Sequence, residues 1–80
     1  MNWFVYILEC VDKSLYTGIT NDVEKRVAAH NKGTASKYTR CRRPVKIVYL
    51  EQLENRSLAS KRELEIKSFS KKKKNDLILG

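Results

Sequence analysis

The chain has 80 residues, and its 17 Lys and Arg against nine Asp and Glu give a formal net charge of +8. A chain this short buries only about 60% of the surface that it exposes when unfolded, so we expect one modest core in a single domain over residues 1–80. No apolar run approaches the roughly 20 residues of a membrane span, and the first residues lack the basic start and the cleavage site of a secretory signal. We therefore expect a cytoplasmic protein with no membrane partner, and the positive charge makes nucleic acid the leading class of partner.

Two strands and a hairpin are expected first. The opening run "WFVYILECV" is nearly continuous in aromatic and β-branched residues, which predicts a strand covered on both faces and central in its sheet. "DKS" at 12–14 predicts a three-residue loop, because no Asn-Gly or Asp-Gly pair is present for a two-residue turn. "LYTGIT" predicts the second strand. With a three-residue loop, Tyr6 and Tyr16 lie on the same face of the sheet.

A helix of about ten residues is expected next. Val23 and Val27 are four residues apart, Asn21 or Asp22 can cap the helix N-terminus, and Gly33 can end it. These signals predict an amphipathic helix whose valines point at the sheet.

The second half of the chain predicts one more strand and one more long helix. "TASKYTRCRRP" is expected to be a basic loop with one irregular turn, and "VKIVYLEQL" predicts the third strand. "NRSLASKRELEIKSFS" predicts a helix capped by Asn55 or Ser57. The core is expected over about residues 3–69, and the basic tail 70–80 either continues as a short helix or frays. The order of elements predicts an α+β fold, with helices covering a three-stranded sheet and the first strand in its centre.

The order and spacing of these motifs resemble the GIY-YIG nuclease superfamily. "FVY" in the first strand, "YTG" in the second some ten residues on, "EKRVAAH" in the first helix and a late helical Glu carry the resemblance. "YTGITNDVEKRVAAHNKGTASKYT" and "RRPVKIVYLE" are similar to the small, standalone branch of that superfamily. The resemblance covers nearly the whole chain. It implies a divalent-metal-dependent phosphodiesterase built on a three-stranded antiparallel sheet with flanking helices.

Carried over position by position, the resemblance implies a site of catalytic side chains from four different elements. These are Tyr6, Tyr16, Arg26, His30 and Glu63. Gly18 ends the second motif, and it would leave space for a phosphate to approach beside Tyr16.

Phosphodiester hydrolysis needs a metal, neutralisation of the phosphoryl oxygens and an aligned water. The resemblance implies that Glu63 supplies the carboxylate for Mg²⁺ or Mn²⁺. Arg26 would present its planar fork to the non-bridging oxygens. Tyr16 and His30 are the candidates for steering or deprotonating the water, and Tyr6 for holding the water or the phosphate.

Each of these residues also has an ordinary interpretation. His30 suits a solvent-facing position at the end of a helix, where the helix dipole favours a cation. Arg26 suits a solvated surface position, and tyrosines are common in strands. At about 100° per residue, Glu63 and Glu65 flank the apolar stripe of their helix on opposite sides, so only the resemblance selects Glu63.

A basic stretch with one aromatic residue is the predicted contact with the nucleic-acid backbone. Its members are Lys37, Tyr38, Arg40, Arg42 and Arg43. Tyr38 can stack on a base. The run "KKKK" from Lys71 is expected to be a solvated helix end that adds to the general field.

Two positions depart from the family pattern. Phe4 stands in place of the glycine that gives the first motif its name, and Ile19 stands where some relatives carry a lysine. One cationic contact to phosphate is therefore missing, which argues against sequence-specific cleavage. The sequence predicts a structure-selective or nonspecific endonuclease that acts on DNA, with RNA left open as a second substrate. The alternative is a catalytically weak nucleic-acid-binding module that retains the nuclease fold. We expect a monomer, and a protein partner could supply specificity.

Overall fold

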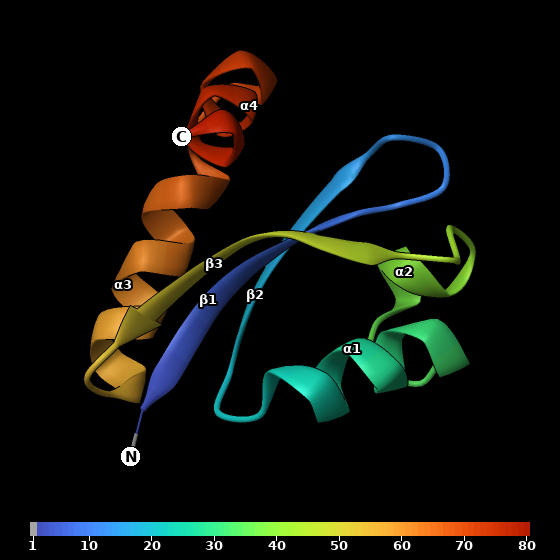
Figure 1. Cartoon of the computed structure of the whole chain (residues 1–80), viewed down its shortest axis with the longest axis horizontal. Coiled ribbons are helices and arrows are strands. Elements are labelled where there is room, and N and C mark those ends of the chain that lie inside the picture. The colour runs from blue at the N-terminus through green and yellow to red at the C-terminus, as the bar shows by residue number, and fades with distance from the viewer. Residues whose placement is uncertain (1) are drawn as a thin grey trace.

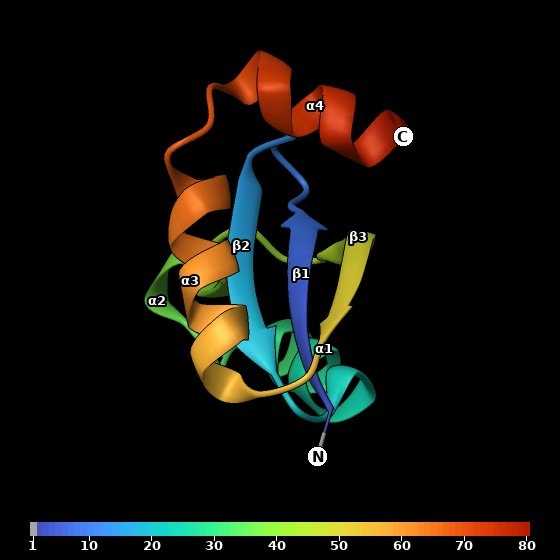
Figure 2. The ribbon, with the colours of Figure 1, turned by 90° about the vertical axis from the view of Figure 1, so that its left-hand side faces the viewer.

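The computed structural model describes residues 2–80 as three strands and four helices (Figure 1). The strands are β1 (Trp3–Glu9), β2 (Leu15–Thr20) and β3 (Lys46–Leu53). The helices are α1 (Val23–Lys32), α2 (Lys37–Arg40), α3 (Arg56–Lys67) and α4 (Lys71–Leu79). The strands form one antiparallel sheet in the order β2-β1-β3, which Figure 2 shows from one side. The predicted α+β fold with the first strand in the centre is confirmed.

The two faces of β1 are covered by different helices. Four consecutive residues of the strand, from Val5 to Leu8, are buried, as expected for a strand covered on both sides. On one face, α3 packs over a cluster whose buried members are Val5, Ile7, Ala59 and Ile66. On the other face, Val27 of α1 packs against a second cluster, whose buried members are Tyr6, Leu8, Cys10 and Val45. Figure 1 shows α3 with α4, and α1 with α2, on opposite sides of the strands.

The hairpin between β1 and β2 has a three-residue loop, one residue earlier than predicted. The backbone N–H of Cys10 donates to the carbonyl of Ser14 at 2.9 Å, so the loop consists of residues 11–13 rather than 12–14. Lys13, the third residue of the loop, has a φ of 70°, which is the left-handed position that such loops place last.

The shifted loop preserves the facing of the two tyrosines. Leu8 pairs with Tyr16, and Tyr6 pairs with Gly18. Because residues directly opposite share a face, and residues two apart in a strand do too, Tyr6 and Tyr16 both lie on the α1 face. The expectation that the two phenols share one face of the sheet is confirmed.

Helix α1 begins and ends where its capping residues predict. The Asp22 side chain accepts from the backbone N–H of Lys25, and Gly33 closes the helix with a φ of 83°. The stretch that was expected to be a basic loop contains α2, a single helical turn capped by Ser36. This turn holds the basic stretch against α1.

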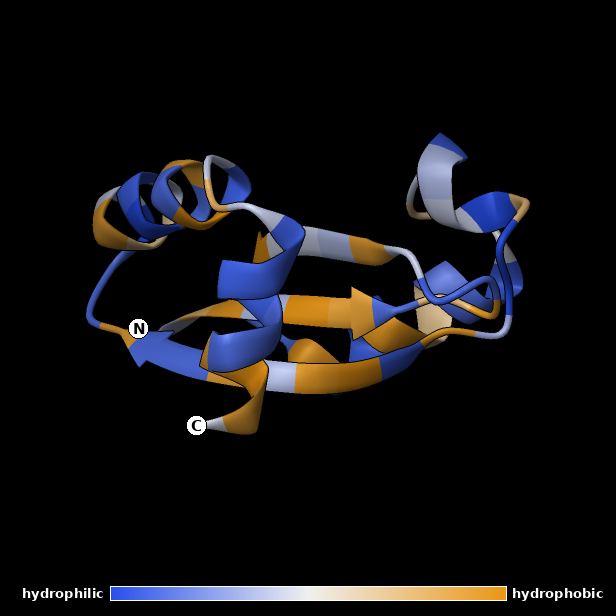
Figure 3. Cartoon of the chain, turned by 90° about the horizontal axis from the view of Figure 1, so that it is seen from above, coloured by the Kyte–Doolittle hydropathy of each residue, from blue (hydrophilic) through white to orange (hydrophobic). Residues whose placement is uncertain are grey.

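The last quarter of the chain is part of the packed fold. Asn55 rather than Ser57 caps α3, and Ser70 caps α4. Leu77 and Ile78 of α4 pack against the cluster under α3, so the core extends beyond the predicted limit of residue 69. Figure 3 shows the change along α4, from hydrophilic lysines at its start to apolar residues near the C-terminus. None of the helices in residues 2–80 is long and apolar enough to cross a membrane.

Candidate active site

A buried chain of hydrogen bonds starts at Tyr6 in the central strand. The Tyr6 hydroxyl lies 2.9 Å from His30 Nε2, and His30 Nδ1 lies 2.8 Å from Thr39 Oγ1. The Thr39 hydroxyl in turn donates to the Ser36 carbonyl at 3.4 Å. If each hydroxyl donates onward, His30 carries its proton on Nδ1 and accepts from Tyr6 at Nε2. The chain therefore connects β1, α1 and α2 through polar side chains, and those of Tyr6, His30 and Thr39 are buried.

His30 is an internal residue. Its exposed fraction is 0%, so the solvent-facing position suggested by its place near the helix end is wrong. Burial lowers the pKa of His30, and the charge of Arg26 lowers it further, which keeps the imidazole neutral at pH 7. Because both ring nitrogens are engaged, His30 cannot contact a substrate water directly. Its expected role as a base is thereby corrected to one of holding Tyr6.

Gly18 makes room for Tyr6 rather than for a phosphate. A Cβ atom at Gly18 would lie 2.5 Å from the Tyr6 hydroxyl and 2.7 Å from Cζ of the same ring. Any side chain at this position would collide with the phenol. The space that was expected to admit a phosphate is filled by Tyr6, so that prediction is wrong.

Tyr16 and Arg26 lie at the margin of the buried chain. The Tyr16 ring packs edge-on against the imidazole of His30, with centroids 5.1 Å apart and an interplanar angle of 63°. Tyr16 and Arg26 are both partly exposed, unlike Tyr6 and His30. The Nε atom of Arg26 is buried and has no hydrogen-bond partner among residues 2–80. Such an unpaired buried donor is uncommon in folded proteins.

Glu63 is the carboxylate on the side of the tyrosines. Burial raises the pKa of Tyr6; Arg26 opposes the rise, and Tyr16 and Glu63 add to it. The charges of Arg26 and Glu63 therefore both reach the Tyr6 phenol. The Glu63 side chain is 20% exposed and forms an ion pair with Lys67 at 3.4 Å. The two phenols and His30 thus lie together on the α1 side of the sheet, and the charge of Glu63, which belongs to α3, reaches Tyr6.

Glu65 is committed to a different network. Its carboxylate pairs with Arg62, whose Nε also bonds to Glu51 at 3.1 Å, and Tyr49 donates to the same Glu51. This network lies toward β3, on the side of α3 away from Tyr6. Packing therefore separates the two glutamates that helical periodicity left equivalent, because Glu65 is held toward β3 while the charge of Glu63 reaches Tyr6.

The aromatic residue of the basic stretch lies against Tyr16. Tyr38 is 38% exposed, and its ring centroid is 5.8 Å from that of Tyr16. The guanidinium of Arg42 lies 4.1 Å above the Tyr38 ring and donates to Asp12 at 3.1 Å. Tyr38 is therefore an aromatic surface next to the predicted site, and Arg42 fixes its orientation.

The remaining cations of the stretch divide into two kinds. Arg43 donates to the carbonyls of Arg40 and Asn31, so it stabilises the loop that follows α2. Lys37 and Arg40 are exposed and form no ion pair within the described part of the chain. Lys37 and Arg40 are therefore cations of the stretch whose charge no carboxylate among residues 2–80 compensates.

Thr39 is a site residue that sequence reasoning missed. It is fully buried and bonds to His30, yet it lies in a stretch that was expected to be a loop. Thr17, between the two motif residues of β2, pairs with Ile7 and so lies on the α3 face, where its hydroxyl is buried with no partner among residues 2–80. A threonine directly after a tyrosine is too common a pattern to have identified Thr39.

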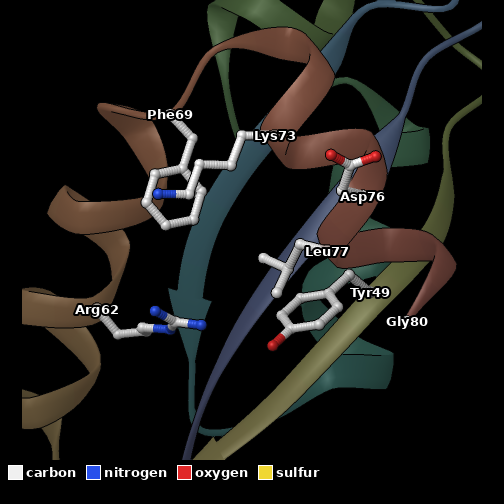
Figure 4. Close-up of a pocket in the computed structure, with 7 residues that line it drawn as sticks. All are labelled: Tyr49, Arg62, Phe69, Lys73, Asp76, Leu77 and Gly80. Atoms are coloured by element: carbon white, nitrogen blue, oxygen red, sulfur yellow. The ribbon is translucent and has the colours of Figure 1, made fainter.

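A larger hollow lies away from these residues. It has a volume of about 700 Å³ and opens between α3, α4 and β3, where Tyr49, Arg62, Phe69 and Leu77 line it (Figure 4). Arg62 there is already held by two carboxylates. This hollow contains none of the predicted catalytic residues, so size alone does not locate the site.

A three-stranded antiparallel sheet with paired phenols, a helical arginine and a late glutamate beside them defines the class of GIY-YIG domains. The family model described as "GIY-YIG catalytic domain" matches residues 2–76. The chain belongs to the GIY-YIG family.

Within the family, this chain is similar to other small proteins. It is 53% identical over 75 residues to UPF0213 protein SSP2268 of Staphylococcus saprophyticus, covering 94% of this chain and 92% of that one. It is 55% identical over 74 residues to UPF0213 protein HQ_3675A of Haloquadratum walsbyi, covering 92% and 83%. The solution NMR structure of UPF0213 protein BH0048 from Bacillus halodurans matches with a TM-score of 0.63 at 44% identity, covering 98% and 83%. That of protein EF2693 from E. faecalis matches with a TM-score of 0.65 at 38% identity, covering 95% and 81%.

Proposed function

We propose that the protein is a divalent-metal-dependent endonuclease that hydrolyses phosphodiester bonds in DNA, in a structure-selective or nonspecific manner. The observation that carries the proposal is the grouping of Tyr16, Arg26 and Glu63 around the buried phenol of Tyr6. A positive charge can stabilise the phosphoryl oxygens, a carboxylate can hold a metal, and a phenol that reaches solvent can orient the attacking water.

The donor set fits a hydrated magnesium ion. Residues 2–80 contain no group of three or more His, Cys, Asp and Glu side chains able to enclose a metal. Mg²⁺ does not need such a cage, because it keeps several waters and binds through one or two carboxylates and the phosphates of its substrate. Glu63 would hold Mg²⁺ or Mn²⁺ here. The bound ion would stabilise negative charge on the phosphoryl oxygens.

Arg26 is suited to bind the phosphate. Its guanidinium has no carboxylate partner within residues 2–80, and its Nε is buried without an acceptor. A planar guanidinium binds two phosphate oxygens at once, which an ammonium cannot do. A substrate phosphate would therefore supply the acceptor that the fold leaves out.

The two phenols have different parts. Tyr16 is the one that reaches solvent, so it is the group that can orient the attacking water; it would accept the proton of that water only in its ionised form. Tyr6 is 1% exposed and bonded to His30. It holds His30 and, through the imidazole, the edge of the Tyr16 ring in place.

The test is cleavage of single-stranded, nicked and branched DNA in Mg²⁺ or Mn²⁺, with two glutamate variants compared. Glu63→Gln is expected to lower kcat by at least about 100-fold, since loss of one group that stabilises transition-state charge costs that much. Glu65→Gln, on the same helix but outside the site, is expected to stay within about twofold. Arg26→Ala and its neighbour control Lys25→Ala should differ in the same way.

Two results would contradict the proposal. One is a wild-type protein that cleaves none of these substrates in either metal. The other is equal activity in Glu63→Gln and Glu65→Gln. Salt-sensitive binding without cleavage would favour the nucleic-acid-binding module instead.

A further inference from the structure

The lysine run at the start of α4 is not simply a solvated helix end. Two of its members line a hollow of about 240 Å³ formed where the hairpin, α2 and α4 meet. The residues that line it are Ser14, Leu15, Tyr38, Lys71 and Lys74. The start of α4 thus meets Tyr38, the aromatic residue that packs on Tyr16, although the two are far apart in the sequence.

The lysines of α4 are divided between two sides of the helix. Lys71 and Lys74 are three residues apart and share one face. Lys73 lies over the ring of Phe69, 4.2 Å from its centroid, and lines the larger hollow on the other side. None of the four lysines forms an ion pair with a carboxylate in residues 2–80. Lys71 and Lys74 therefore bring two uncompensated charges to one small concave surface, and Lys74 is partly buried there.

This hollow adjoins the candidate active site along an open sheet edge. Strand β2 is an outer strand of the sheet, and its residues Leu15 and Tyr16 are neighbours. Leu15 lines the hollow, whereas Tyr16 packs on His30 and Tyr38. Tyr38 belongs to both places. Because neighbouring residues of a strand face opposite sides of a sheet, a chain molecule held at Tyr16 would reach the hollow by following Tyr38 around the edge of β2.

We propose that this hollow is a second binding site for the DNA strand, in which Lys71 and Lys74 bind the phosphates that follow the one held at Arg26. The proposal rests on the proposed function for the identity of the bound molecule. Nucleic acid suits the surface because its phosphates recur at every nucleotide, so a strand at Tyr16 presents further anions along the same edge. Lysines bind phosphate as point charges and position the strand without reading its sequence. The exposed part of the Tyr38 ring forms the wall against the sugar or the base between those phosphates.

The test compares two charge-matched double variants of the full chain. Lys71→Gln/Lys74→Gln removes the two charges that line the hollow, and Lys72→Gln/Lys73→Gln removes two charges from the same helix outside it. Binding of a fluorescein-labelled single-stranded oligonucleotide is measured by anisotropy without divalent metal, so that no strand is cut. We expect a loss of about tenfold in affinity for the first variant and less than about threefold for the second. The dependence of log K on log salt should become shallower by about 1.4, since each single-strand phosphate contact contributes about 0.7.

Kinetics give an independent measurement. The Lys71→Gln/Lys74→Gln variant should raise KM and leave kcat unchanged, because the hollow binds substrate and transition state equally. Equal loss of affinity in both double variants would mean that only the general field matters, and would overturn the proposal. If cleavage is absent but the first variant alone loses affinity, the nuclease function fails and the binding site stands. Should the double variant unfold in a thermal melt, Lys71→Gln and Lys74→Gln are tested singly, each with about a threefold expected loss.

Discussion

The two faces of the central strand bury side chains of different chemistry. Under α3, Val5 and Ile7 meet Ala59 and Ile66, and that cluster is aliphatic. Under α1, Tyr6 bonds to His30, and the chain of polar groups continues into α2. Both faces are equally closed to water, so the difference lies in what each one buries rather than in how deeply.

The two faces therefore have different roles: one stabilises the fold, and the other positions the groups of the candidate site. Aliphatic burial stabilises in proportion to area and tolerates some change of shape. A buried polar chain holds its members in one arrangement only while every donor and acceptor is paired. We infer that the α3 face supplies most of the folding free energy, whereas the α1 face fixes the groups next to Tyr16.

The largest expected effect on stability belongs to the aliphatic face. Ile7→Ala should lower the free energy of unfolding by about 2–5 kcal/mol, because Ile7 is fully buried and its loss leaves a cavity. Urea denaturation measures this change. Ile7→Val, with an expected loss of about 0.5–1.5 kcal/mol, serves if the first variant does not fold. Nuclease activity per folded molecule should stay near wild type, and a large fall in kcat would contradict the separation of the two faces.

A smaller loss is expected from the polar face, together with a change at the site. Thr39→Val removes the partner of His30 Nδ1 and should cost about 1–3 kcal/mol by leaving a buried donor unpaired. Thr39→Ser keeps the hydroxyl and should restore most of it. The ¹⁵N chemical shifts of the imidazole should show the Nδ1–H tautomer in the wild type and a mixture in Thr39→Val. An unchanged tautomer in Thr39→Val would show that Thr39 does not hold the ring.

The smallest effect is a dependence of stability on pH. The pKa of His30 is lowered in the folded state from an ordinary value of about 6.5. The unfolded chain therefore takes up a proton first, so the stabilisation is present above pH 6.5 and is lost as the pH falls toward the folded pKa. The slope is at most about 1.4 kcal/mol per pH unit, and the sequence contains one histidine, so the effect has a single source in this range. His30→Gln should lack this slope. A wild-type stability that is flat from pH 7 to 5.5 would contradict the buried, neutral imidazole.

Local signals predicted the elements well because they act within a few residues. The capping role of Asp22 and the end of α1 at Gly33 follow from side-chain and backbone chemistry that needs no tertiary partner. The shared face of Tyr6 and Tyr16 follows from the odd number of residues in the loop. That number is three as predicted, although the loop begins one residue earlier. The shift itself came from a distant contact: the Val11 N–H donates to the Arg42 carbonyl at 3.0 Å.

The site was harder to predict because its partners are far apart in sequence. Nothing near His30 indicated that Tyr6 and Thr39 would enclose it. Glu63 and Glu65 lie at similar angles on either side of the apolar stripe. The structure distinguishes them because Arg62 holds Glu65 on the β3 side. The packing of α4 also depends on distant parts of the chain, because Leu77 and Ile78 pack on a cluster formed by β1 and α3.

The central claim is that Glu63, the α3 carboxylate whose charge reaches Tyr6, is the one that holds the metal. The most direct measurement is a titration of ¹⁵N-labelled protein with Mn²⁺, followed by paramagnetic broadening of the amide signals. We predict that broadening is strongest around Glu63 and in β2 near Tyr16, and that Glu63→Gln abolishes it while Glu65→Gln does not. Broadening centred on Glu51 and Glu65, or broadening that persists in Glu63→Gln, would contradict the account.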